Sequence, residues 1–455
     1  MTIDLSTLTF SNGADIVPGS GQDDIVNTGI ANTFKGNDTI TGIGPYDPNN
    51  PSSGYGIYNT GTLNTAEGND IITAEGDEVA IYNTGTFNTG QGKDVITGTG
   101  GYYADGIVNT GTFNTAEGDD TITGNGGRYG YRGGINNSGT FNTGQGNDII
   151  SAGGVYGGIV NTGTFNTAEG NDAITGTATA TGSSYKYDGI FIADGSTLDT
   201  GNGHDKISGE GRNGIYNASI TFNTGDGNDT IAGTGSTDGI QNEGLINTGN
   251  GKDTIIAKGG AYGLSNRSTI NTGYGDDIIN VIGTLANSGT IDTGYGSDTI
   301  TASSAFYQNA TLDTGDGDDM ITGLNGLYNG GTINTGDGKD TITSSKGIQN
   351  QGIINTGNGA DSIIADGGFA SMGSVFLGSG NDSLKGFGTG NFNGGNNEDT
   401  LELTSGTYTV GKSGSTTVSF TKSGLIMYTS DFEKLKAGNT MYNFTDLIDT
   451  QIIVV

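Results

Sequence analysis

The stretch INTGDGKDTITSSKGIQNQGIINTGNGADSII, from Ile333 to Ile364, contains one phrase twice. In each copy a Gly-x-Gly is followed two residues later by an aspartate, and an isoleucine follows that aspartate by two residues. The two aspartates, Asp340 and Asp361, are 21 residues apart. Self-similarity at a fixed period indicates a repeat architecture, in which each repeat is one structural unit.

The aspartate of this phrase recurs along most of the chain. From Asp205 onward the spacing is 24 residues three times and then 21 residues five times. The phrase aspartates are Asp15, Asp23, Asp38, Asp70, Asp94, Asp120, Asp148, Asp172, Asp205, Asp229, Asp253, Asp277, Asp298, Asp319, Asp340, Asp361 and Asp382, and Asp399 follows with Asn397 in place of a glycine.

Isolated apolar residues recur with the phrase and predict the fold. Ile279, Leu285, Ile291 and Ile300 are separated by 6, 6 and 9 residues, and the same steps continue in the following coils. No 3.6-residue period is present, so helices are excluded, and one inward side chain suits a strand of three or four residues. Only stacked coils can bury such side chains. The sequence therefore predicts an all-β parallel β-solenoid with coils of about 21–24 residues, in which one arm accepts insertions.

Each coil has three arms with one apolar position each, as Ile279 in the first arm, Leu285 in the middle arm and Ile291 in the third arm. Two asparagine columns follow the middle-arm and third-arm apolar positions. We expect them to stack as structural amide ladders at the corners of the coils. They are Asn83, Asn109, Asn137, Asn161, Asn217, Asn242, Asn266, Asn287, Asn329 and Asn350, and Asn64, Asn88, Asn114, Asn142, Asn166, Asn223, Asn247, Asn271, Asn334 and Asn355.

Composition excludes several classes of function. The 455 residues include 89 glycines and no cysteine, and 17 Lys and Arg stand against 49 Asp and Glu, for a net charge of −32. Nucleic acid is disfavoured as a partner, because phosphate recognition needs basic side chains. Disulfides and thiolate metal sites are excluded. No apolar run is long enough for a membrane span, and the N-terminus lacks the features of a secretory signal peptide.

Stacking places each phrase aspartate about 4.8 Å from the next, where two unit charges repel by about 1 kcal/mol in water and by more where water is partly excluded. Ca²⁺, which takes six to eight oxygen ligands in flexible geometry, would reverse this repulsion. We therefore predict about one calcium ion between each pair of adjacent coils; Mg²⁺ fits less well, and an alternative is that Asp and Gly only form turns.

The predicted calcium ligands are the phrase aspartates from Asp23 onward and the glycines of the best-preserved phrases. These aspartates are Asp23, Asp38, Asp70, Asp94, Asp120, Asp148, Asp172, Asp205, Asp229, Asp253, Asp277, Asp298, Asp319, Asp340, Asp361, Asp382 and Asp399, and the glycines are Gly225, Gly227, Gly249, Gly251, Gly273, Gly275, Gly294, Gly296, Gly315, Gly317, Gly336, Gly338, Gly357, Gly359, Gly378 and Gly380. Phe34, Ala66, Ala116 and Ala168 replace the first glycine in four phrases, where we expect weaker sites.

The phrase N-T-G-x-G-[N/D/K]-D-x-I resembles the nonapeptide of hemolysin-type, or RTX, repeat proteins. GDGNDTI (225–231), GQGNDII (144–150) and GSGNDSL (378–384) carry the resemblance, which covers about residues 11–401. It implies calcium binding in a parallel β-roll, export by a type I exporter, and an extracellular or cell-surface location. The family's usual roll has ions on both edges. Here one arm per coil carries the motif. Asp105, Asp188 and Asp238 each stand two residues before an isoleucine of the opposite arm, and these opposite-arm acids are not predicted as sites.

We divide the chain into a lead-in (1–10), the calcium-binding repeats (11–401) and a C-terminal β cap (402–455). Alternating apolar residues in the cap predict antiparallel hairpins. The final DLIDTQIIVV resembles the uncleaved export signal of type I secreted proteins, and a final cap strand is an alternative reading.

Other features give weaker predictions. His204 is expected to be a solvated loop residue. Tyr- and Gly-rich insertions at 44–56, 98–106, 124–134 and 177–189, with Arg128, Arg132 and Lys186, either bind a glycan or surface protein or are tolerated loop length. Outward threonines beside the isoleucines, such as Thr39 and Thr41, suggest an ice-binding face, although this array is interrupted by Ile71, Val95, Ile149, Ala173, Lys206 and Ile278.

The sequence therefore predicts a secreted calcium-binding solenoid that folds on binding calcium and serves as an extracellular structural or adhesive element. We expect no enzymatic activity, because the repeats begin near Gly13 and no catalytic domain precedes them. The alternatives are an RTX-type extracellular enzyme or toxin, or an ice-binding solenoid.

Overall fold

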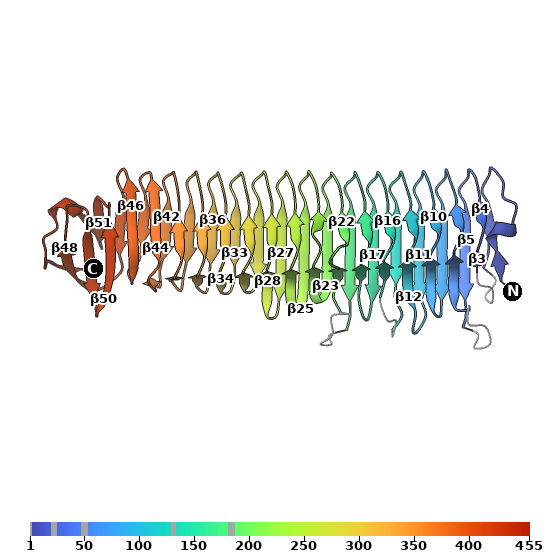
Figure 1. The fold of residues 1–455 in the computed structure, drawn as a ribbon, viewed down its shortest axis with the longest axis horizontal. Coiled ribbons are helices and arrows are strands. Elements are labelled where there is room, and N and C mark those ends of the chain that lie inside the picture. The colour runs from blue at the N-terminus through green and yellow to red at the C-terminus, as the bar shows by residue number, and fades with distance from the viewer. Residues whose placement is uncertain (1, 20–24, 47–52, 129–132, 181–186) are drawn as a thin grey trace. The chain divides into compact units, whose positions relative to one another are not determined.

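The computed structural model describes residues 2–19, 25–46, 53–128, 133–180 and 187–455 (Figure 1). The described residues form β-strands and turns, with two short 3₁₀ helices, η1 (Leu5–Thr7) and η2 (Phe444–Asp446). Two compact units are present: unit 1 comprises residues 1–249 and 256–261, and unit 2 comprises residues 250–255 and 262–455. Among the described residues, no helix has the length and apolar character needed to cross a membrane.

In unit 1 each coil contributes a first-arm strand, a middle-arm strand and a third-arm strand. The first-arm strands are β2 (Ile16–Val17), β5 (Thr39–Gly44), β8 (Ile71–Gly76), β11 (Val95–Gly100), β14 (Thr121–Asn125), β17 (Ile149–Gly154) and β20 (Ala173–Ala178). The middle-arm strands are β1 (Ile3–Asp4), β3 (Ile25–Asn27), β6 (Tyr55–Asn59), β9 (Val79–Asn83), β12 (Asp105–Asn109), β15 (Ile135–Asn137), β18 (Ile159–Asn161) and β21 (Ile190–Ile192). Two long strands, β23 (Lys206–Asn217) and β25 (Thr230–Asn242), run through both arms.

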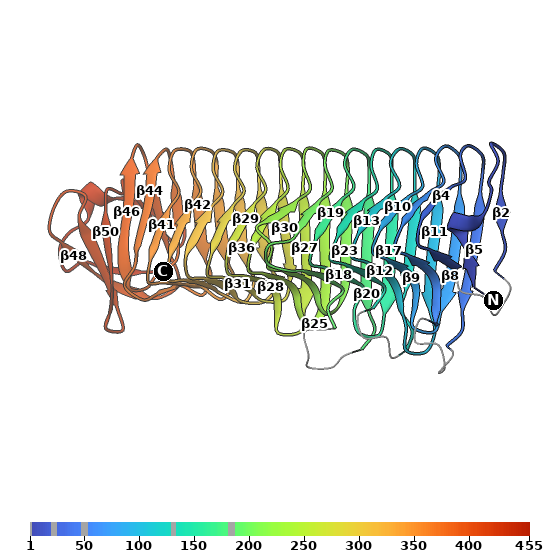
Figure 2. The same ribbon diagram turned by 45° about the vertical axis from the view of Figure 1, so that its right-hand side comes forward.

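The third-arm strands of unit 1 form a second parallel sheet, and Figure 2 shows β4, β10, β13 and β19 in this order along it. They are β4 (Ile30–Asn32), β7 (Thr62–Asn64), β10 (Thr86–Asn88), β13 (Thr112–Asn114), β16 (Thr140–Asn142), β19 (Thr164–Asn166), β22 (Thr197–Asp199), β24 (Thr221–Asn223) and β26 (Leu245–Asn247). One strand, β27 (Thr254–Gly259), is divided between the two units.

Strand register follows the repeat that the sequence predicts. Phe87 of β10 pairs with Leu63 of β7 and with Phe113 of β13, all in parallel. In the first arm Ile96 pairs with Ile72 and Ile122 in the same way. Equivalent residues of successive coils therefore lie above one another, and the prediction of a parallel β-solenoid is confirmed.

The core consists of columns of identical or similar apolar side chains. Ile72, Ile96 and Ile122 are at most 1% exposed. In the third arm Phe113 stacks on Phe87 and on Phe141 with ring centroids 4.7 Å apart. This centroid distance is close to the strand spacing of a sheet, so the rings follow the rise of the coils.

Unit 2 repeats the same arrangement with shorter coils. Its first-arm strands are β30 (Ile278–Ile282), β33 (Thr299–Ala302), β36 (Met320–Gly323), β39 (Thr341–Ser344), β42 (Ser362–Ala365), β45 (Ser383–Lys385), β47 (Thr400–Leu403) and β51 (Lys434–Ala437). The middle-arm strands are β28 (Tyr262–Asn266), β31 (Leu285–Asn287), β34 (Phe306–Gln308), β37 (Leu327–Asn329), β40 (Ile348–Asn350) and β43 (Phe369–Ala370). The third-arm strands are β29 (Thr269–Asn271), β32 (Thr290–Asp292), β35 (Thr311–Asp313), β38 (Thr332–Asn334), β41 (Ile353–Asn355), β44 (Ser374–Ser379) and β46 (Gly390–Asn396).

Antiparallel strands follow the last coils of unit 2. β49 (Val418–Lys422) pairs with β48 (Thr407–Lys412) and with β50 (Leu425–Ser430), and β53 (Ile452–Val454) pairs with β48. β52 (Thr440–Asn443) pairs with β51. Because β50 also continues the parallel sheet beside β46, these hairpins cover a sheet end that would otherwise present unpaired backbone groups. The small β cap expected from the sequence is therefore present.

Both predicted asparagine columns form hydrogen-bonded ladders. In the middle arm the buried Asn59 donates to Asn83 over 2.7 Å, and Asn83 donates to Asn109 over 2.8 Å. In the third arm Asn88 donates to Asn64 over 2.7 Å. The middle-arm amides also bond to backbone carbonyls, such as Asn83 to Thr112, so they hold neighbouring coils together.

Candidate metal site along the aspartate column

The phrase aspartates form a buried column, here called the aspartate column, just before each first-arm strand. Asp70 is fully buried, Ile71 is 48% exposed and Ile72 is buried. Because strand side chains alternate between faces, an aspartate two residues before a core isoleucine must also point inward. The column comprises Asp15, Asp38, Asp70, Asp94, Asp120, Asp148, Asp172, Asp205 and Asp229 in unit 1, and Asp253, Asp277, Asp298, Asp319, Asp340, Asp361, Asp382 and Asp399 in unit 2.

From Asp38 onward, Oδ1 of successive column aspartates within each unit accepts a hydrogen bond from the preceding coil. The backbone N–H of Asp38 donates to Oδ1 of Asp70 over 2.7 Å, and that of Asp70 donates to Oδ1 of Asp94 over 2.8 Å. In unit 2 the N–H of Asp319 donates to Oδ1 of Asp340 over 2.9 Å. These bonds align the column and fix the orientation of every carboxylate.

The second carboxylate oxygen has no hydrogen-bond partner in most of the column. A neutral threonine hydroxyl lies beside these carboxylates: that of Thr33 donates to Oδ2 of Asp38. The Thr65 hydroxyl lies beside Asp70, where it lowers the pKa of the carboxyl, and it also reaches the carbonyl of Thr89 over 3.0 Å. A buried polar atom without a partner costs roughly 1–3 kcal/mol, and more if it is charged. The residues with an unpartnered Oδ2 include Asp70, Asp94, Asp120, Asp148, Asp172, Asp205, Asp277, Asp298, Asp319, Asp340, Asp361, Asp382 and Asp399.

Burial raises the pKa of these carboxyl groups, because removal from water penalises the charged form. It raises the pKa of Asp70 to about 6, against opposing contributions from the Thr65 hydroxyl and the Asp38 N–H. It raises the pKa of Asp319 to about 8, with Asp298 and Asp340 adding repulsion. The pKa is also raised to about 7 for Asp120, Asp172, Asp277 and Asp382, to about 6 for Asp205, Asp298, Asp340 and Asp399, and upward for Asp94, Asp148 and Asp361.

The second glycine of each phrase lets the backbone carbonyl of the preceding coil approach closely, next to the phrase aspartate. A Cβ added at Gly170 would lie 1.6 Å from the carbonyl oxygen of Gly146 and 3.2 Å from Oδ1 of Asp172. Within the described residues, no backbone hydrogen bond ends on the Gly146 carbonyl. The same holds for the carbonyls of Gly68, Gly92, Gly118, Gly203, Gly275, Gly296, Gly317, Gly338 and Gly359.

This donor set fits a hard divalent cation. Carboxylate and backbone carbonyl oxygens are the ligands that Ca²⁺ takes. In the described part of the chain, Asp229 and Asp253 apart, no aspartate of the column forms an ion pair with Lys or Arg. No cluster of three or more His, Cys, Asp or Glu side chains able to hold a metal occurs there either. An ion would therefore take one or two carboxylates and complete its shell with carbonyls and water.

The structure brings the predicted aspartates together within each unit, from Asp38 to Asp229 in unit 1 and from Asp253 to Asp399 in unit 2. Asp23 lies outside the described residues. Asp15, which shares the phrase but is not among the predicted ligands, donates its N–H to Oδ1 of Asp38 over 2.8 Å. Ile25, two residues after Asp23, pairs with Ile57 in the middle arm, so Asp15 belongs to the first complete phrase.

The predicted glycines adopt conformations that suit their places in the phrase. The first glycine is left-handed, as at Gly225 with φ 83°, and the second is more extended, as at Gly227 with φ 153°. Phe34, Ala66 and Ala116 keep φ at 68° in the first position. The turn is thus preserved where glycine is replaced, at a cost of order 1–3 kcal/mol for a non-glycine residue in this region.

Sequence reasoning missed the coil-to-coil hydrogen bonds accepted by the residue before many of the aspartates. The side chain of Asn69 accepts the backbone N–H of Lys93 over 2.8 Å, and that of Asn171 accepts the N–H of His204 over 2.7 Å. His204 is exposed, as expected, and its Nδ1 accepts the N–H of Asn228 over 2.7 Å. The frequency of Asn and Asp at this position was the available signal, because both carry a short acceptor.

The opposite-arm acids are also buried, which the sequence did not predict. Asp188 is 2% exposed and accepts the N–H of Asn213 and the Nε–H of Arg212. Burial raises its pKa to about 6, and Arg212 opposes that shift. Asp105 accepts the N–H of Gly133 over 3.1 Å. These contacts are structural: they join adjacent coils beneath the insertions.

No protein-family model and no curated protein matches the chain. Among solved structures the chain is similar to the X-ray crystal structure of a hyperactive, Ca²⁺-dependent, beta-helical antifreeze protein from an Antarctic bacterium. The TM-score is 0.36 and the identity 16%, covering 84% of this chain and 82% of that chain. The fold assignment rests on the strand pairing described above, and the functional assignment rests on the geometry of this chain alone.

Proposed function

We propose that this protein is an extracellular solenoid whose coils are held together by divalent cations, Ca²⁺ first, bound along the aspartate column. The observation that carries the proposal is the unpartnered Oδ2 of successive buried aspartates, such as Asp94 and Asp120, with no basic residue to neutralise them. A cation beside these oxygens supplies the missing positive charge, and the second-glycine carbonyls supply further ligands.

Cation binding would then be coupled to folding, because the column exists only when coils are stacked. A ligand that binds only the folded state stabilises it by about 2.7 kcal/mol per site at 100 times its Kd. At low calcium, repulsion within the column keeps the chain open. At the 10⁻⁴–10⁻³ M range of extracellular calcium modules the coils close. Export of an open chain by a type I exporter is consistent with the absence of cysteine and with the RTX resemblance.

We assign this solenoid a structural or adhesive role. The alternative of an RTX-type enzyme or toxin has no supporting observation among the described residues. The adhesive part of the proposal rests on the tyrosines near the insertions, of which Tyr102 and Tyr103 are 54% and 58% exposed. Arg132 and Lys186, which the sequence placed in the same patch, lie outside the described residues.

The test is a thermal-unfolding series followed by circular dichroism in chelator, in millimolar Ca²⁺ and in millimolar Mg²⁺. We expect strand signal and melting temperature to rise strongly with Ca²⁺ and weakly with Mg²⁺. Isothermal titration in parallel would count the ions. Identical melting curves in chelator and in Ca²⁺ would refute the proposal.

A further inference from the structure

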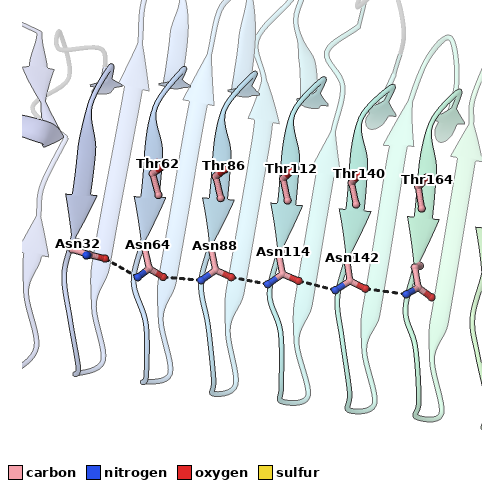
Figure 3. Close-up of a pocket in the computed structure, with 11 residues that line it drawn as sticks. Asn32, Thr62, Asn64, Thr86, Asn88, Thr112, Asn114, Thr140, Asn142 and Thr164 are labelled. Atoms are coloured by element: carbon pink, nitrogen blue, oxygen red, sulfur yellow. Dashed lines mark hydrogen bonds between the residues drawn. The ribbon is translucent and has the colours of Figure 1, made fainter.

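The third-arm sheet of unit 1 presents a face to which β7, β10, β13, β16 and β19 each contribute a threonine and an asparagine, and β4 contributes Asn32 beside the exposed Ile30. We call it the Thr-x-Asn face. Figure 3 shows its threonines and asparagines in two parallel rows, across β4, β7, β10, β13, β16 and β19. Between the rows runs a shallow trough of about 630 Å³. Its lining residues are Asn32, Thr62, Asn64, Thr86, Asn88, Thr112, Asn114, Thr140, Asn142, Thr164 and Asn166.

The two rows differ in how far the protein satisfies their hydrogen bonds. From Asn64 to Asn166 each asparagine uses one N–H on the preceding asparagine, as Asn114 does on Asn88 over 2.6 Å, and keeps a second N–H. The hydroxyls of Thr86, Thr112 and Thr140 have no bond within the described residues. By contrast, the Thr110 hydroxyl, just outside the face, donates to the carbonyl of Asn83. The Thr-x-Asn face therefore offers regularly spaced hydroxyl and amide groups to an external partner.

Charge and composition restrict that partner. None of the lining residues is ionisable, in a chain with net charge −32. A charged ligand would find no complementary group, and a purely apolar ligand would leave the hydroxyls and amides unpaired. No aromatic side chain lines the trough, so the stacking surface that sugar rings favour is missing. The groups on this face match a neutral partner that both donates and accepts hydrogen bonds at a regular spacing.

The spacing matches ordered water. Successive coils repeat at about 4.8 Å, and residues i and i+2 of a strand lie about 6.6 Å apart. Water molecules joined by hydrogen bonds of 2.7–2.8 Å at tetrahedral angles have second neighbours about 4.5 Å apart. Neighbouring coils can therefore anchor second-neighbour waters of one tetrahedral layer, and the asparagine ladder fixes these anchors in advance. We propose that the Thr-x-Asn face binds the surface of ice.

The same arm of unit 2 provides an internal contrast. There Asp292 and Asp313 interrupt the asparagine row between Asn271 and Asn334, and the threonine row ends at Ile353. The outward first-arm column of unit 1 is interrupted as well, since Thr39 pairs with Ile71 and Ala173 pairs with Lys206. The proposal therefore assigns ice binding to β4–β19 and not to the threonines beside the core isoleucines.

The test compares ice-growth inhibition by the full chain in saturating Ca²⁺ with that of two matched double variants. Thr112→Tyr with Thr140→Tyr places bulky rings in the middle of the face. Thr311→Tyr with Thr332→Tyr makes the same change at the same strand position in β35 and β38. We expect the parent and the unit 2 variant to shape ice crystals and block recrystallisation, and the unit 1 variant to lose this activity while keeping its circular dichroism spectrum.

Three results would overturn the inference: an inactive parent, an unaffected unit 1 variant, or equal losses in both variants. Sedimentation of the parent and the unit 1 variant at 20 °C tests whether the face binds a second copy of the chain instead. If the parent self-associates and the variant does not, the face is an interface between copies of the chain. The measurement is independent of the cation proposal, because melting in chelator tests that proposal separately.

Discussion

At the scale of single residues, a buried carboxylate contributes no folding stability unless a cation or a proton neutralises its charge. Asp120 illustrates this: it is 1% exposed, its Oδ2 has no partner, and burial raises its pKa to about 7. Its chain neighbour Asp119 is exposed and paired with Asn147, and that contact lowers its pKa. Adjacent aspartates thus serve different purposes, and only the inward one fits a metal ligand.

Asp120→Asn removes a ligand, and Asp119→Asn makes the same charge change outside the column. In millimolar Ca²⁺ we expect Asp120→Asn to lower stability by about 2.7 kcal/mol, the value for one site filled at 100 times its Kd. In chelator at pH 8 it should be no less stable than the parent, because the amide needs no counter-charge. Denaturant unfolding measures both. Equal effects of the two variants in Ca²⁺ would show that the column does not bind the ion.

Gly227→Ala and Gly225→Ala test the two glycines of one phrase. A Cβ at Gly227 would lie 1.4 Å from the carbonyl oxygen of Gly203, and one at Gly225 would lie 1.7 Å from that of Gly201. At the first position, however, Ala66 and Ala116 show that a coil can adjust to alanine. We expect a loss of 1–3 kcal/mol for Gly225→Ala, since that φ remains accessible to alanine at a cost, and a larger loss or misfolding for Gly227→Ala. Urea unfolding ranks the two, and a reversed order would contradict the structure.

At the scale of the strand, stability comes from columns rather than from single contacts. Phe113 is fully buried between Phe87 and Phe141. Leu63 and Leu198 occupy the same column in other coils, so the space tolerates either shape.

Phe113→Ala should cost about 3–5 kcal/mol, because the rings above and below cannot close the cavity. Phe113→Leu should cost less than about 1.5 kcal/mol. Thermal unfolding in Ca²⁺ measures both changes. A small loss for alanine would mean that the coils collapse around the gap, and the core would then be less tightly packed than the ring stack indicates.

The strand columns could be predicted from sequence because spacing alone sets their register. Ile279, Ile300 and Ile321 recur at the coil length, and they pair directly. The inward direction of the aspartates follows from the same alternation. The hydrogen bond from Asp38 to Asp70 could not be predicted, because it depends on how two coils are offset. The asparagine row of the Thr-x-Asn face was predicted as an amide ladder, but the threonine row beside it was not, because the sequence does not show which hydroxyls stay without a partner after stacking.

At the scale of the whole molecule, the raised pKa values give the cation-free protein an unusual dependence on pH. A carboxyl group whose pKa is raised by folding contributes stability that is fully present below its unfolded value and is lost as pH rises through its folded value. The unfolded value is 3.8 and the folded values are about 6 for Asp70, 7 for Asp172 and 8 for Asp319.

In chelator we therefore expect stability to fall between about pH 5 and pH 8. In saturating Ca²⁺ the trend should reverse, since protons compete with the ion for the same oxygens. Melting temperatures at pH 5 and pH 8, each with and without Ca²⁺, compare the stability of the protein under these four conditions. A cation-free protein that is more stable at pH 8 than at pH 5 would exclude these aspartates as the titrating groups.

The hydrogen bonds of the aspartate column all run in one direction along unit 2. Each N–H reaches forward to the carboxylate of the next coil, and the last, on Asp399, reaches Glu433 in the segment that ends the coils. The two ends of this array are therefore inequivalent, like the ends of a polar filament. A coil added at the C-terminal end would accept a hydrogen bond from the last free backbone N–H of the column. A coil added at the N-terminal end would instead donate its own backbone N–H to the first carboxylate.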